Sequence, residues 1–115
     1  MKLQNVVIPT NSFSQSLVFY RDVLLLPVVY QSENSCFLNA GTVHIAIHAI
    51  EQGDHFTPTG HGYYLDFLVD DMAHAKERLA QANVVILREW IDNDMVLLLI
   101  ADPDGNRLEL YSRQK

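Results

Sequence analysis

The stretch DPDGNRLELYS, residues 102–112, decides the fold because it joins a turn-forming run to an alternating strand. Asp, Pro, Gly and Asn favour tight turns, since Pro restricts φ while Gly and Asn tolerate positive φ. The strand that follows carries Glu109 between Leu108 and Leu110. Successive side chains point to opposite faces of a strand, so Glu109 is predicted to lie opposite these leucines. That face is either open to water, or it lines a site that uses the carboxylate.

The composition indicates one globular domain that binds neither nucleic acid nor membranes. The chain has 115 residues, of which 49% are hydrophobic, and no apolar run is long enough to span a bilayer. Fourteen acidic and eight basic residues give a net charge of −6, which disfavours phosphate backbones and mildly favours neutral or cationic partners. The lone Cys36 cannot form an internal disulfide, and no signal peptide precedes the first predicted strand. We therefore expect a cytoplasmic protein.

Hydrophobic periodicity predicts a strand, a helix and three further strands in the first half of the chain. The helix begins after Asn11 or Ser12, either of which can cap it, and stops before Pro27. Pro9 is predicted to end the first strand. The predicted strands cover residues 3–8, 28–31, 36–39 and 43–50.

The same order recurs in the second half, after a polar connector rich in Gly and Pro. Asp70 or Asp71 can cap a helix over residues 72–82, and the predicted strands cover residues 63–69, 84–90, 95–101 and 107–111. We interpret this as an internal repeat in pattern. The predicted organisation is a single domain over residues 1–115, with module 1 at about 1–50, a connector at 51–62 and module 2 at about 63–115.

Three stretches resemble the vicinal oxygen chelate superfamily, which includes glyoxalases, bleomycin-resistance proteins and extradiol dioxygenases. They are SLVFYRDVLLLPVV (16–29), LDFLVDDMAHAKERLAQANV (65–84) and DPDGNRLELYS (102–112). The resemblance covers nearly the whole chain. It implies an α+β fold in which two βαβββ modules form a curled mixed sheet around a cleft. This fold hosts several chemistries as well as pure binding proteins, so it does not by itself assign an activity.

The resemblance also implies where a metal would bind. Metal-using members take ligands from the first and last strands of each module, usually His or Gln on the first and Glu or His on the last. The matching positions in this chain are Asn5, Tyr64, Ala46 and Glu109. Only Glu109 is a strong ligand for a divalent cation.

Two histidines could add to this set only with a change of register. His44, Ala46 and His48 share one face of the predicted strand over residues 43–50. Four residues along a strand span about 13 Å, so His44 and His48 cannot chelate one ion together. No cofactor is therefore favoured. If a divalent metal binds, the expected ligands are Glu109 with His44 or His48.

Two functions from different classes stay open. The first, which we favour, is a metal-free small-molecule-binding protein that holds an aromatic or cationic ligand in a cleft, as the bleomycin-resistance branch does. The second is a divalent-metal-dependent enzyme of the glyoxalase or dioxygenase type, a lyase, isomerase or ring-cleaving dioxygenase. The expected ligand-binding residues are Asn5, His44, Ala46, His48, Tyr64, Asp66, Trp90, Arg107, Glu109 and Tyr111.

The oligomeric state follows from the resemblance alone. Members of the superfamily are often dimers, so we expect a homodimer. The apolar run at residues 95–100 and the connector are the candidate interfaces.

Overall fold

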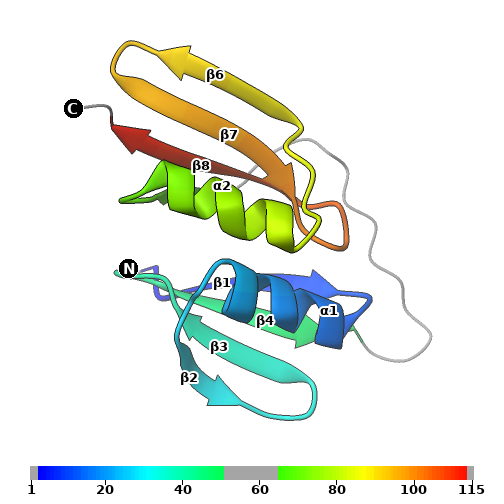
Figure 1. Cartoon of the computed structure of the whole chain (residues 1–115). Helices are drawn as coiled ribbons and strands as arrows, with labels where there is room; N and C mark the ends of the chain where they lie inside the picture. The colour runs from blue at the N-terminus through cyan, green and yellow to red at the C-terminus, as the bar shows by residue number, and fades with distance from the viewer. Residues whose placement is uncertain (1–2, 51–64, 114–115) are drawn as a thin grey trace. The chain divides into compact units, whose positions relative to one another are not determined.

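A computed structural model of the chain describes residues 3–50 and 65–113. The chain divides into two compact units, Met1–Thr57 and Pro58–Lys115. We call their described parts module 1 (residues 3–50) and module 2 (residues 65–113). Each module holds one four-stranded mixed sheet and a helical segment, and the sheets are not closed into a barrel (Figure 1). The predicted α+β fold is confirmed. Within the described residues, no helix is long and apolar enough to cross a membrane.

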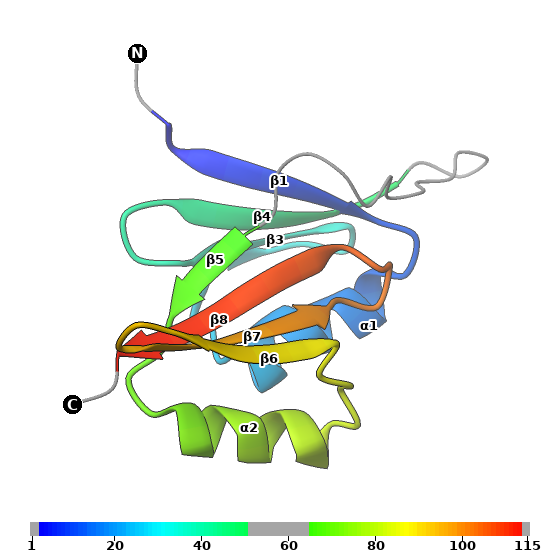
Figure 2. The same cartoon turned by 90° about the horizontal axis from the view of Figure 1, so that it is seen from above.

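Module 1 follows the predicted order of strand, helix and three strands. Its sheet has the strand order β1-β4-β3-β2, in which β1 runs parallel to β4 and the other neighbours are antiparallel (Figure 2). The helical segment continues from α1 directly into a π-helical turn, η1. The elements are β1 (Asn5–Thr10), α1 (Phe13–Leu17), η1 (Val18–Val23), β2 (Val28–Gln31), β3 (Ser35–Asn39) and β4 (His44–Ala49).

Module 2 repeats this topology with the strand order β5-β8-β7-β6, in which β5 runs parallel to β8 (Figure 2). Asp71 caps α2 as predicted, because its side chain accepts a hydrogen bond from the backbone N–H of His74 at 3.0 Å. The elements are β5 (Leu65–Leu68), α2 (Met72–Gln81), β6 (Arg88–Asp92), β7 (Met95–Ala101) and β8 (Arg107–Arg113).

Each sheet buries one face with its own helical segment. In module 2 the ion pair between Lys76 of α2 and Glu89 of β6 lies on this covered side. Strand alternation then leaves the residues between the buried ones on the opposite face. The buried apolar residues are Ile8, Leu17, Phe19, Tyr20, Cys36, Leu38, Ile45, Ala46 and Ile47 in module 1, and Ala75, Leu79, Leu97, Leu98, Ile100, Leu108 and Leu110 in module 2. Of these, Ala46 and Leu97 lie on the face opposite the helical segment.

Several predicted strand boundaries differ from the structure, most by one or two residues at an end, and two of the differences have a clear local reason. Pro9 does not end the first strand but lies inside β1, which is an edge strand where a missing N–H costs no ladder hydrogen bond. The strand predicted over residues 84–90 begins only at Arg88. The backbone N–H of Val84 instead closes the end of α2 by donating to the carbonyl of Leu79 at 2.9 Å.

The turn at residues 102–106 is closed by the Asp102 side chain. Its Oδ1 accepts hydrogen bonds from the backbone N–H groups of Asp104 and Asn106, and its Oδ2 accepts one from the Asn106 side-chain amide. Gly105 has φ of +93°, a conformation that glycine adopts without strain. Asp102 is buried. This turn therefore sets where β8 begins, and with it the register of Glu109.

Candidate functional site

The face of the module 2 sheet opposite α2 carries five of the ten predicted site residues, and we call it the open face of module 2. Directly paired residues on neighbouring strands point to the same side of a sheet. The strand register therefore defines two rows across this face. The first row is Asp66, Glu109, Leu99 and Arg88, and the second is Leu68, Tyr111, Leu97 and Trp90.

The first row begins with two carboxyl groups. Asp66 on β5 lies directly opposite Glu109 on β8, and their side chains share a hydrogen bond. Glu109 is 8% exposed, whereas Asp66 is exposed. A hydrogen bond between two carboxyl groups requires a proton on one of them. The pair is therefore built to hold a proton.

Both carboxyl groups have a raised pKa, for different combinations of causes. Burial raises the pKa of Glu109, and the negative charge and hydrogen bond of Asp66 raise it further. Burial also raises the pKa of Asp66, while the hydrogen bond from Glu109 lowers it. Because the groups interact directly, they titrate as a pair.

This pair predicts that the protein loses stability as the pH rises through the range between the ordinary carboxyl pKa, about 4, and the raised pKa of Glu109. Within this range the folded state binds more protons than the unfolded state, so deprotonation favours unfolding. Glu109→Gln removes the titration and keeps a hydrogen-bond donor. We expect this variant to melt above the wild type at neutral pH and to depend less on pH.

Thermal unfolding followed across the acid-to-neutral range measures both effects. Glu89→Gln is the matched control, because Glu89 lies on the other face of the same sheet in an exposed ion pair with Lys76. A Glu109→Gln variant with the pH profile of the wild type would show that Glu109 titrates normally.

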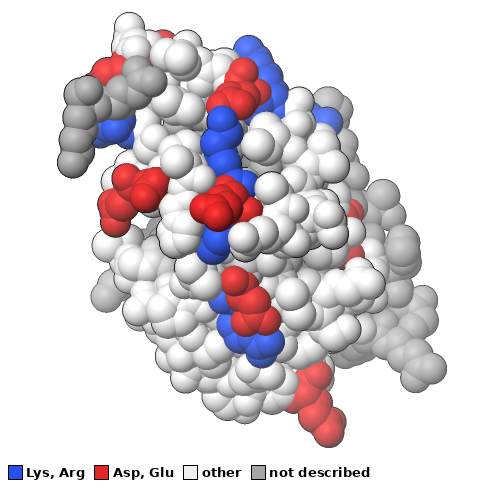
Figure 3. All heavy atoms as spheres, viewed as in Figure 1, with Lys and Arg blue, Asp and Glu red and all other residues white. Residues whose placement is uncertain are grey.

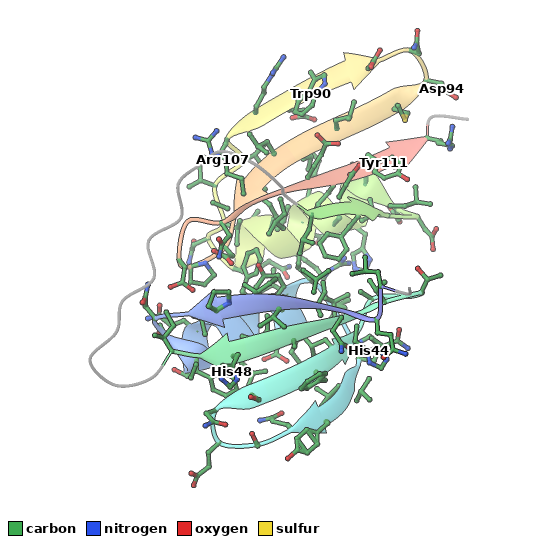
Figure 4. All side chains as sticks on the ribbon, turned by 180° about the vertical axis from the view of Figure 1, so that it is seen from behind. His44, His48, Trp90, Asp94, Arg107 and Tyr111 are labelled. Atoms are coloured by element: carbon green, nitrogen blue, oxygen red, sulfur yellow. The ribbon has the colours of Figure 1, made fainter. Side chains whose placement is uncertain are left out.

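The second row supplies an aromatic and apolar surface beside the carboxyl pair. Tyr111 on β8 and Trp90 on β6 flank Leu97, which each of them faces across a strand pair (Figure 4). The guanidinium carbon of Arg88 lies 4.5 Å from the centre of the Trp90 ring, a cation–π contact. The two rows lie two residues apart along each strand, about 7 Å, so a flat molecule that covers the second row extends to the edge of the first.

The open face of module 1 carries the other predicted residues. Asn5, Ala46 and His48 lie on the same face as His44, because Asn5 pairs directly with His44 and the strands alternate. His44 and His48 lie toward opposite ends of β4 (Figure 4). His48 is engaged locally, since its Nδ1 lies 2.6 Å from the hydroxyl of Ser35 on β3.

The described donor residues do not fit a divalent metal centre. Within residues 3–50 and 65–113, no group of three or more His, Cys, Asp or Glu side chains is placed to hold an ion. The carboxyl pair supplies two oxygen-donor groups, and a catalytic zinc site usually has three protein ligands.

The structure also locates the remaining predictions. Tyr64, like the connector at residues 51–62, lies outside the described residues. Arg107 lies on the same face of β8 as Glu109, but no ion pair joins the two among the described residues. Sequence reasoning missed Arg88 and the leucines of β7. The turn at residues 92–94 could have indicated these residues, because a hairpin turn fixes which residues of its two strands pair, here Arg88 with Leu99.

Two βαβββ modules, the second with an acid on its last strand, define a protein of the vicinal oxygen chelate class. The chain belongs to the Glyoxalase/Bleomycin resistance protein/Dioxygenase superfamily, whose family model matches residues 2–110.

Solved structures share the fold across the whole chain. A Bacillus anthracis protein described as belonging to the glyoxalase family has a TM-score of 0.80 at 19% identity, over 99% of this chain and 96% of that one. A lactoylglutathione lyase from Agrobacterium tumefaciens has a TM-score of 0.70 at 18% identity, over 96% and 92%. A virulence protein from Salmonella typhimurium has a TM-score of 0.72 at 22% identity, over 98% and 97%. At these identities the likeness shows the fold alone.

Proposed function

We propose that this protein binds a small aromatic cation on the open face of module 2 and does so without a metal. The observation that carries the proposal is the Asp66–Glu109 carboxyl pair beside the row of Tyr111, Leu97 and Trp90. A cation that reaches the pair replaces the shared proton and meets two negative charges. The planar part of the same molecule covers the aromatic row.

The charge of module 2 supports a cationic ligand. Residues 65–113 contain ten acidic and five basic side chains, a balance of −5. A site partly shielded from water strengthens the attraction between the carboxylates and a cation. The cleft implied by the superfamily, which would enclose such a ligand, is part of this proposal.

The proposed function predicts that benzylamine binds more tightly than benzyl alcohol, its uncharged analogue of similar shape. Asp66→Asn and Glu109→Gln should each weaken benzylamine binding about tenfold, which corresponds to about 1.4 kcal/mol, and leave benzyl alcohol unaffected. Because the cation displaces a proton, its affinity should rise with pH through the range in which the pair titrates. Isothermal titration calorimetry measures the affinities.

The control for this experiment is Asp70→Asn, which removes an exposed carboxylate just after β5 without touching the pair. Equal affinity for the amine and the alcohol would refute the recognition of a cation. Equal losses in Asp70→Asn and Glu109→Gln would show a general effect of net charge.

The alternative function is a divalent-metal-dependent enzyme of the glyoxalase or dioxygenase type. It is supported by one observation, that Glu109 lies on β8, the last strand of module 2, where the resemblance to metal-using members of the superfamily implies a ligand. Elemental analysis of protein purified without chelators distinguishes the two. A tightly held, stoichiometric ion that Glu109→Gln releases would replace the proposal by this alternative.

A further inference from the structure

The open face of module 2 carries opposite charges at the two ends of one row. This row crosses all the strands of the sheet and consists, from β5 to β6, of Asp66, Glu109, Leu99 and Arg88. Neighbouring strands lie about 4.8 Å apart, so the backbone of Arg88 lies two strands, or about 10 Å, from that of Glu109. Among the described residues, no ion pair joins Arg88 to either carboxyl group. The row therefore has a negative end and a separate positive end.

Arg88 is positioned by an aromatic ring. Its guanidinium carbon lies 4.5 Å from the centre of the Trp90 ring. A guanidinium that lies over a ring interacts through its flat face, and this contact uses none of its N–H donors. Those donors form a planar fork that matches the two oxygens of a carboxylate. Trp90 therefore orients Arg88 and leaves its donors available to an anion from outside the protein.

The other side of the same sheet pairs its charges internally. Glu89, the residue after Arg88, points to the face covered by α2 and forms an ion pair with Lys76 of that helix. Figure 3, which views the molecule from the side of α2, shows cationic and acidic atoms next to one another. Within the described part of the chain, Arg88 is thus a cation that module 2 does not neutralise with one of its own carboxylates.

The aromatic row connects the two ends of the charged row. Trp90 follows Arg88 by two residues on β6, on the same face of the sheet. Tyr111 follows Glu109 by two residues on β8, also on this face (Figure 4). A planar molecule that covers Trp90, Leu97 and Tyr111 therefore has one end beside Glu109 and the other end beside Arg88.

The second cation of this face lies in a different direction. Arg107 precedes Glu109 by two residues on β8, so it lies on the side of Glu109 away from Tyr111 (Figure 4). A ligand that extends from the carboxyl pair over the aromatic row points away from Arg107. Arg88 is the cation that such a ligand reaches.

We propose that the ligand of this face is a zwitterion, an aromatic amine that carries a carboxylate at the opposite end of its ring system. Its ammonium group binds Asp66 and Glu109, its ring covers the aromatic row, and its carboxylate binds Arg88 through two N–H groups. This inference rests on the proposed function, which supplies the amine and the ring, and it adds the anionic group and its position. An α-amino acid carries both charged groups on one carbon atom and cannot reach both ends of the row.

Two isomers test the separation of the charges. 4-(Aminomethyl)phenylacetic acid and phenylalanine have the same formula and the same charged groups, but only the first has them at opposite ends of its ring. We expect the first to bind about tenfold more tightly than phenylalanine and about tenfold more tightly than its own methyl ester, measured by isothermal titration calorimetry. Equal affinity of the acid and its ester, or of the two isomers, would overturn the proposal.

Arg88→Gln tests the position of the anion. It should reduce the preference for 4-(aminomethyl)phenylacetic acid over its methyl ester from about tenfold to near one. The matched control is Arg78→Gln, which removes the same charge from α2 on the other side of the sheet and should keep the preference. A preference that survives in Arg88→Gln, or that disappears equally in Arg78→Gln, would exclude Arg88 as the binding group. Loss of the preference only in Arg107→Gln would place the anion at the other cation and overturn the proposal.

The same titrations separate this inference from the proposed function. Benzylamine that binds through the carboxyl pair, together with an acid that binds no better than its ester, would overturn the zwitterion alone. Benzylamine that binds no better than benzyl alcohol would overturn the proposed function. If Asp66→Asn left the affinity for 4-(aminomethyl)phenylacetic acid unchanged, the ammonium group would not bind the carboxyl pair and the zwitterion would be excluded.

Discussion

Replacing Asp102 by alanine should lower the free energy of unfolding by about 3 kcal/mol, since hydrogen bonds to a charged group are each worth about 1.5–3 kcal/mol and are not additive. Asp102 is 5% exposed and accepts three hydrogen bonds, two from backbone N–H groups and one from the Asn106 side chain. Alanine leaves these donors without their acceptor next to the start of β8. Urea unfolding monitored by circular dichroism measures the loss.

Two variants calibrate this result. Asp102→Asn keeps an oxygen for the two backbone N–H groups but turns an amide toward the Asn106 side chain, so we expect a smaller loss. Asp94→Ala removes an exposed aspartate from the turn between β6 and β7, and should change stability by less than about 0.5 kcal/mol. If Asp102→Ala and Asp94→Ala were equally mild, the turn would not depend on the buried carboxylate.

The second large effect concerns the two cores. Leu98 in module 2 and Ile47 in module 1 are both fully buried, at 0% exposure. Leu98→Ala and Ile47→Ala each create a cavity and lose the transfer free energy of the removed methyl groups, so each should cost about 3 kcal/mol. If the chain is one cooperative domain, as its sequence predicts, both substitutions should lower the midpoint of a single unfolding transition.

Calorimetry tests this expectation directly. A single transition that moves by a similar amount in both variants supports one domain over residues 1–115. Separate transitions, each shifted by only one substitution, would show that the modules unfold independently. The matched controls are Val7→Ala and Leu68→Ala, whose side chains are 60% and 59% exposed and should matter little.

Much of the fold could be predicted from local patterns. The strand at residues 95–101 was predicted with its observed bounds, because an apolar run between two turn signals leaves few alternatives. Asp71 was one of two predicted caps of α2. A capping side chain bonds to a backbone N–H within the next three residues, so the local sequence is enough to predict it. The errors at Pro9 and at residues 84–87 have a common cause. A proline is tolerated inside a strand when that strand lies at the edge of its sheet, and a strand begins later when the end of a helix binds the next N–H group. Both conditions depend on the tertiary structure, so the hydrophobic pattern of the sequence does not reveal them.

The candidate site was predicted less completely. Period-two alternation correctly placed His44, Ala46 and His48 on one face of β4. The partner of Glu109 was harder to foresee, because Arg107 and Tyr111 on its own strand were the nearest candidates in sequence. The structure pairs Glu109 with Asp66 instead. The bound ligand, the dimer and the cellular compartment stay predictions.

By itself the sequence determined the order of the elements, the repeat of the two modules and the presence of an acid on the last strand. These follow from hydrophobic period and turn chemistry, which act between residues close in the chain. Only the tertiary structure decided that Asp66 faces Glu109, that Trp90 and Tyr111 share a row, and that Arg88 lies over Trp90. The physical reason is that strand register depends on packing across a whole sheet, where a shift of one residue turns every side chain to the other face.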